Sequence, residues 1–136
     1  MRKQRAFLLP AVICPILPSI PIPLFEGDVY LCRSRKDWDA TMGHYRCDQF
    51  VQPNSAGMCV SIASATDGAV YVIGVFDRSV ATLAHEALHA VVFILKEAGV
   101  PVTEENDEVM AYLLGHLMRE LLPIFGAATH ARHTRG

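Results

Sequence analysis

The segment His85-Glu86-Ala87-Leu88-His89 has the spacing H-E-x-x-H. Positions i and i+4 of an α-helix lie on one face, so the two imidazoles can bind one metal ion. Glu86 lies at the edge of that face, where its carboxylate can hold a water molecule at the metal and remove a proton. Chance would place this pattern in such a chain about once in a hundred. The spacing therefore favours a Zn²⁺ site with Glu86 as general base.

A third metal ligand has to come from elsewhere, because catalytic zinc sites use three protein ligands and leave one position for water. The metzincin continuation His-x-x-Gly-x-x-His is absent, since an apolar run beginning at Ala90 follows His89. We expect Glu108 to be the third ligand. It opens a predicted buried apolar stretch, where an unpaired carboxylate would be unfavourable. Glu105 and His116 are the alternatives.

Two further side chains are candidates for the same site. Tyr112 and His116 follow Glu108 at positions i+4 and i+8, so the three lie roughly on one face of a helix. A tyrosine hydroxyl or an imidazolium can stabilise the oxyanion of a tetrahedral intermediate, so both are candidate catalytic residues. The alternative is that Tyr112 is a core aromatic residue and His116 a hydrogen-bonded core histidine.

The histidines need a helix to position them, and the apolar pattern predicts one over residues 80–98. Asp77 or Ser79 can cap its start, and Gly99 suits its end. A second helix is predicted over residues 104–122. Acidic residues load its first turn, Pro123 ends it, and its apolar residues lie nearly all round, which predicts burial.

Short strands are predicted over residues 28–32, 58–63 and 69–76, and the Asp67-Gly68 turn joins the last two into a hairpin. Ser34 can cap a short helix that ends near Gly43. These elements predict one α+β domain over residues 26–125, with a small, mostly antiparallel sheet packed on the two long helices.

The chain ends differ in composition from this domain. Residues 1–25 start with basic residues and continue as an apolar run that resembles part of a signal peptide. Five prolines interrupt the run and would remove helical hydrogen bonds, so we expect no membrane span. We expect an extended arm that packs on the domain or mediates an oligomer or partner contact. Residues 126–136 are predicted to be a flexible tail.

The charge and the cysteines exclude other classes. A net charge of −2 argues against broad nucleic-acid binding, which needs a concentrated positive field. The four cysteines form no C-x-x-C pair, so we expect free thiols in a reducing compartment and a cytoplasmic location. A weaker alternative is a metal site made of His44 and Cys47 with Cys32 or Cys59.

The metal pattern also resembles a known family. H-E-x-x-H on one helix, with a glutamate on the next, is similar to zincin metallopeptidases of the Glu-ligand type. The stretch E-V-M-A-Y-L-L at residues 108–114 resembles the E-x-x-A-x-x-(F/L) pattern of the ImmA/IrrE group of small bacterial and phage metallopeptidases. The resemblance covers about residues 70–123. It implies a minimal zincin-like fold with zinc ligands His85, His89 and Glu108, and Glu86 as general base.

The resemblance also implies that the strand at residues 69–76 presents an edge on which an extended peptide can pair. The chain lacks the helix-turn-helix domain of that group, so the substrate is not implied. We expect zinc-dependent hydrolysis of a peptide bond in a peptide or protein substrate. The alternative is a non-catalytic metal-binding or assembly protein, such as a phage or virion component.

Overall fold

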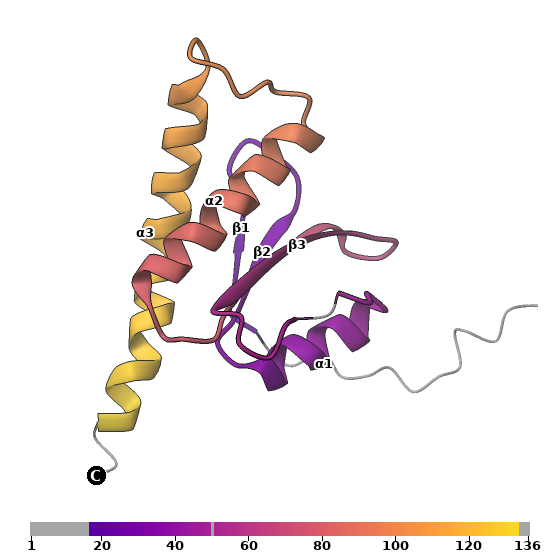
Figure 1. Cartoon of the computed structure of the whole chain (residues 1–136). Coiled ribbons are helices and arrows are strands. Elements are labelled where there is room, and N and C mark those ends of the chain that lie inside the picture. The colour runs from indigo at the N-terminus through magenta and orange to yellow at the C-terminus, as the bar shows by residue number, and fades with distance from the viewer. Residues whose placement is uncertain (1–16, 50, 134–136) are drawn as a thin grey trace, which may run out of the picture.

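Four strands pair into one mixed sheet in the described part of the chain, residues 17–49 and 51–133 of this computed structural model (Figure 1). The sheet order is β1 (Ser19–Pro21), β2 (Asp28–Cys32), β4 (Gly68–Val75) and β3 (Gly57–Ser64). Three helices accompany it: α1 (Arg35–Tyr45), α2 (Val80–Glu97) and α3 (Asp107–His133). This arrangement confirms the predicted α+β class.

The pairing of the strands decides which of them lies at an edge. β3 and β4 form the predicted antiparallel hairpin, and β1 pairs antiparallel with β2. β2 and β4 pair in parallel, so β4 has a neighbour on each side. The expectation that residues 69–76 present an open edge is therefore wrong, because the crossover through α1 brings β2 onto that side. The edge beside α2 belongs to β3.

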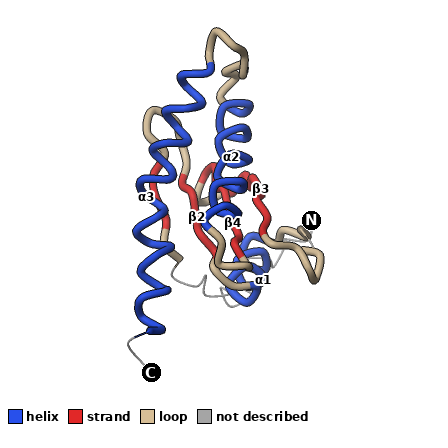
Figure 2. Tube along the Cα trace, turned by 60° about the vertical axis from the view of Figure 1, so that its left-hand side comes forward, coloured by secondary structure: helices blue, strands red, loops and turns tan. Residues whose placement is uncertain are grey.

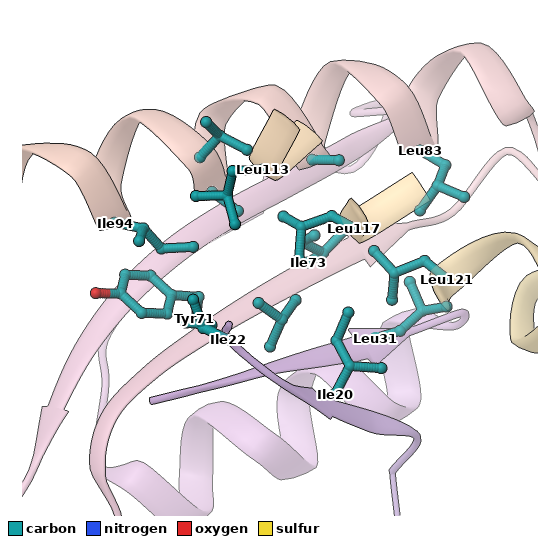
Figure 3. Close-up of a cluster of buried hydrophobic side chains, with 14 of the residues drawn as sticks. Ile20, Ile22, Leu31, Tyr71, Ile73, Leu83, Ile94, Leu113, Leu117 and Leu121 are labelled. Carbon is teal, nitrogen blue, oxygen red and sulfur yellow. The ribbon is translucent and has the colours of Figure 1, made fainter. Parts of the chain in front are cut away.

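Two apolar clusters cover the two faces of the sheet. On one face, α2 and α3 pack over side chains such as Leu31 and Ile73 (Figure 3). On the other face, Trp38 and Met42 of α1 pack against Val70 and neighbouring side chains. Figure 2 shows α2 and α3 running side by side, with α1 apart from them. The long helices therefore share one face of the sheet, and the short helix has the other.

The helix that carries the two histidines begins and ends close to its predicted limits. The Ser79 hydroxyl oxygen accepts from the backbone N–H groups of Ala81 and Thr82, at 3.1 and 3.4 Å. Asp77 accepts from the Thr82 hydroxyl and the Ser79 N–H, at 2.7 and 3.0 Å. These charge-assisted bonds hold the pKa of Asp77 below its ordinary value. Both candidate caps therefore act together at the start of α2.

The other end of α2 is bonded to the sheet. The hydroxyls of Ser61 in β3 and Tyr71 in β4 both donate to the carboxylate of Glu97. Burial, this hydrogen bond and the Glu97 charge all raise the pKa of Tyr71. Since a hydrogen bond to a charged group contributes about 1.5–3 kcal/mol, these two bonds fix the end of α2 on the hairpin.

The third helix differs from its prediction in three ways. It begins at Asp107 and continues to His133, so Pro123 lies inside it and residues 126–133 are helical instead of a flexible tail. An exposed proline is tolerated here because core residues Leu121 and Phe125 hold the helix on either side of it. The helix is also buried along one face only.

The buried face of α3 is a stripe of residues spaced four apart: Leu113, Leu117, Leu121 and Phe125. Other apolar residues of α3 are partly exposed, among them Val109, Tyr112 and Leu122. The prediction that this stretch is buried nearly all round is therefore wrong. α3 lies at the edge of the two-helix layer, where only one side of it contacts the sheet and α2.

The described part of the N-terminal arm belongs to the sheet. β1 adds an edge strand beside β2, and the side chains of Ile20 and Ile22 are only 4% and 5% exposed within the main apolar cluster. The domain therefore begins before residue 26. Residues 1–16 of the expected arm lie outside the described residues. Among the described helices, none combines the length and apolar character that crossing a membrane requires.

Candidate metal centre

His85 and His89 stand side by side on the exposed face of α2. Their Nε2 atoms are 3.2 Å apart, and the His85 side chain is 68% exposed. Zinc binds imidazole nitrogen at about 2.0–2.1 Å, so one ion touching both atoms would make an N–Zn–N angle of about 100°, close to tetrahedral. Without a metal, one ring can donate to the other. The pair is thus already spaced to chelate one ion.

Glu86 lies on the sheet side of the histidine pair. Its residue is 7% exposed, and its Oε1 atom is 4.0 Å from the Nε2 atom of His85. Burial raises the pKa of Glu86, and the neighbouring charges of His85 and His89 reduce that rise. A carboxylate of raised pKa is a stronger base than an exposed one, which suits a group that must take a proton from water.

Gly57, the first residue of β3, makes room for Glu86. A Cβ atom at Gly57 would lie 2.7 Å from the Gly74 carbonyl oxygen, 2.7 Å from Cγ2 of Thr82 and 3.0 Å from Cγ of Glu86. β3 can therefore approach α2 this closely only with glycine at this position. The residue pattern did not single out Gly57, and the available signal was a glycine directly before the strand predicted over residues 58–63.

A cavity of about 470 Å³ opens beside Glu86, between the start of β3 and the first turns of α2. Small side chains form most of its wall. The cavity is lined by Ser55, Ala56, Gly57, Ala81, Thr82, His85 and Glu86. The general-base candidate and one metal-ligand candidate therefore face the same open space.

The expected third ligand does not lie with the histidines. In Figure 3, Leu83 of α2 lies near Leu121 of α3, while Ile94 lies toward the Leu113 end, so the helices run antiparallel. Glu108 precedes Leu113 by more than one turn, and it forms no group of three metal ligands with the two histidines among the described residues. Glu108 is also exposed, so the burial argument for it fails.

The alternative third ligands do not lie with the histidines either, in the part of the chain that the structure describes. No group of three His, Cys, Asp or Glu side chains suited to a metal ion occurs there. Neither Glu105 nor His116 therefore completes a three-ligand site with the histidines. The alternative set of His44 and Cys47 with Cys32 or Cys59 does not form a site either. Cys32, Cys47 and Cys59 are not paired in disulfides, in agreement with the expected thiols. Cys14 lies outside the described residues.

The two catalytic candidates on α3 are not in contact with the pair. Tyr112 is 62% exposed, so it is not the core aromatic residue of the alternative interpretation. His116 is half-buried beside Leu117. Across the described chain, no hydrogen bond or ion pair links either residue to His85 or His89. The structure thus brings together His85, Glu86 and His89, and leaves Glu108, Tyr112 and His116 on a separate helix.

Cys59 is a neighbour of Glu86 that the sequence did not indicate. Burial of the thiol, and then the charge of Glu86, raise the pKa of Cys59 far above its ordinary value. The group therefore stays a protonated thiol and is a poor nucleophile.

In comparisons with known proteins, no protein-family model, no curated protein and no solved structure matches the chain.

We predict that Gly57→Ala destabilises the protein by about 1–3 kcal/mol, because the added methyl must displace the strand backbone, Thr82 or Glu86. Chemical denaturation measures the loss. Gly115→Ala is the matched control, since a Cβ there meets nothing within 4 Å and alanine favours the helix. Equal stability of the Gly57→Ala variant and the parent would contradict the close approach of β3 to α2.

Proposed function

We propose that the protein is a zinc-dependent peptidase, with His85 and His89 as metal ligands and Glu86 as general base. The observation that carries the proposal is the histidine pair, with Nε2 atoms 3.2 Å apart beside a buried carboxylate on an open cavity. Two imidazoles at tetrahedral spacing suit zinc, and the adjacent cavity can take a substrate chain.

Bound zinc would lower the pKa of a water molecule and polarise the carbonyl of the scissile peptide bond. Glu86 accepts the proton of that water while the water oxygen bonds to the carbonyl carbon. The C–N bond then breaks, and Glu86 passes the proton to the leaving amine. The raised pKa of Glu86 suits both transfers. The products are a carboxylate and a protonated amine, which balances the addition of one water.

The substrate would be a peptide or protein segment in extended conformation. β3 is the edge strand beside α2, and its first residue lines the cavity. An edge strand offers unpaired backbone groups to a peptide, so the substrate can add to the sheet while its carbonyl reaches the histidine pair. This assigns to β3 the pairing role that the sequence had given to residues 69–76.

We propose Glu108 as the third ligand, brought to the histidines by a rearrangement of the start of α3 when zinc binds. At that start Val109 and Tyr112 are exposed, Met110 is only partly buried against the main cluster, and the fully buried stripe begins at Leu113. The free energy of zinc binding can offset the ordering of such a segment. Tyr112, one turn after Glu108, would move with it and become available to stabilise an oxyanion.

Metal content is the first test. The purified, untagged protein should contain about one zinc per chain by elemental mass spectrometry, because three ligands hold a catalytic ion. A His85→Ala/His89→Ala variant should contain none. A parent protein that takes up no zinc even from excess metal would contradict the proposal.

Glu86→Gln should retain zinc and lose about 10²–10⁴-fold in peptide hydrolysis, because an amide cannot take the proton. Hydrolysis of a quenched fluorescent peptide library measures the loss. The variant should fold well without metal. Since burial raises the pKa of Glu86 above 4.5, ionisation lowers the stability of the metal-free parent as pH rises past that value, and glutamine removes the effect. Parental hydrolysis by this variant would refute the mechanism.

Glu108→Ala should weaken zinc affinity at least tenfold, since it removes one of three protein ligands. Competition with a chelating dye measures the affinity. Glu105→Ala is the control, because Glu105 is an exposed carboxylate close by in the loop before α3. Unchanged affinity in Glu108→Ala would assign the third position to another group.

A second candidate function is metal-dependent assembly without catalysis. Leu88 and Val92 are 40% and 39% exposed, and they lie on the same face of α2 as the two histidines. Apolar residues around a two-ligand metal site suit a contact with another chain, which would supply the missing ligands. Half a zinc per chain, together with a zinc-dependent rise in molecular mass, would favour assembly over hydrolysis.

A further inference from the structure

The loop before β3 forms one wall of the cavity and is bonded to a single side chain of α1. The guanidinium of Arg35 donates to three backbone carbonyls of this loop: Gln52 at 3.1 Å, Pro53 at 2.7 Å and Ser55 at 2.9 Å. Ser55 and the next residue, Ala56, line the cavity with Glu86. Together with the loop's own bonds from Ser55 to Gln52 and Gly57, this charged group holds the wall that faces His85 and Glu86.

Arg35 is itself held in place. Its guanidinium carbon lies 4.9 Å from the centre of the Phe76 ring, a cation–π distance. The Phe76 ring meets Trp38 edge-on, with centroids 5.9 Å apart, and Trp38 is fully buried. The Phe76 N–H also donates to the carbonyl of Ala56 at 2.8 Å. The buried cluster under α1 thus fixes both Arg35 and the end of the loop.

These bonds set the orientation of the peptide group between Ser55 and Ala56. In a trans peptide the carbonyl and the N–H point in opposite directions. The Ser55 carbonyl points to Arg35, so the Ala56 N–H points away from it. Among the described residues, this N–H donates no hydrogen bond. A cavity-lining residue therefore offers a free donor whose direction Arg35 determines.

We propose that Arg35 is a positioning residue for substrate binding: it fixes the Ser55–Ala56 peptide so that the Ala56 N–H donates to a carbonyl oxygen of a peptide in the cavity. This inference rests on the proposed peptidase function, since it names how that site holds its substrate. Lysine cannot replace Arg35, because a single ammonium lacks the planar fork that reaches three carbonyls at once.

The test compares two kinds of zinc-binding probe on the zinc-loaded protein. Acetohydroxamic acid binds the metal alone. Two dialanine hydroxamates bind the metal and also extend along the cavity. One carries the hydroxamate at its carboxyl end and the other at its amino end, so that the two extend in opposite directions. Arg35→Gln should bind acetohydroxamic acid like the parent and bind at least one dialanine hydroxamate about tenfold more weakly, the value of one hydrogen bond. Arg35→Lys should show the same selective loss.

Lys36→Gln is the matched control, because Lys36 is the next residue of α1, carries the same charge and is exposed. It should bind all three probes like the parent. Hydrogen–deuterium exchange should rise at residues 52–57 in the Arg35 variants only. Arg35→Lys keeps the charge and the aliphatic stem, so it serves if Arg35→Gln does not fold.

The outcomes separate the two proposals. Parental affinity of both Arg35 variants for both dialanine hydroxamates would overturn the role of Arg35 and leave the zinc site standing. A zinc-loaded parent that binds none of the hydroxamates would overturn the proposed function and this inference with it. Selective loss of dialanine binding, with raised exchange in the loop, would support the assignment.

Discussion

The close approach of α2 to β3 is the constraint on which the rest of the structure depends. Along β3, the side chains that face α2 are small: Gly57, Cys59 and Ser61. Gly57 admits the side chain of Glu86, and Ser61 bonds to Glu97 at the far end of the helix. A larger residue at the first of these positions would meet backbone and side-chain atoms at 2.7 Å, so strand and helix could not keep this spacing.

That approach also sets the electrostatics of the candidate site. Glu86 is buried because the strand lies against it, and burial is the first cause of its raised pKa. The two histidines, one residue before Glu86 and three residues after it, lie together on the neighbouring face of α2 and remain exposed. A protected carboxylate beside exposed candidate ligands would suit metal-assisted hydrolysis, in which the base must be strong and the metal must be reachable.

The two faces of the sheet contribute different parts of the cavity. α2 brings His85 and Glu86 from one face, while α1 sends Arg35 from the other face to the loop before β3. The aromatic pair of Trp38 and Phe76 supports that arginine. The short helix thus contributes to the candidate site, although it is far from the histidines in the sequence.

The sequence by itself determined the local features. The i, i+4 spacing brings His85 and His89 together in any α-helix, and the Ser79 cap and the Asp67-Gly68 turn act within a few residues of themselves. Only the tertiary structure decided that β3 is the edge strand and where Glu108 lies relative to the histidines. It also decided that Arg35 bonds carbonyls 17 to 20 residues away. These depend on the parallel pairing of β2 with β4 and on how α3 packs beside α2. Neither is encoded in residue spacing, because both arise from burial shared among distant segments.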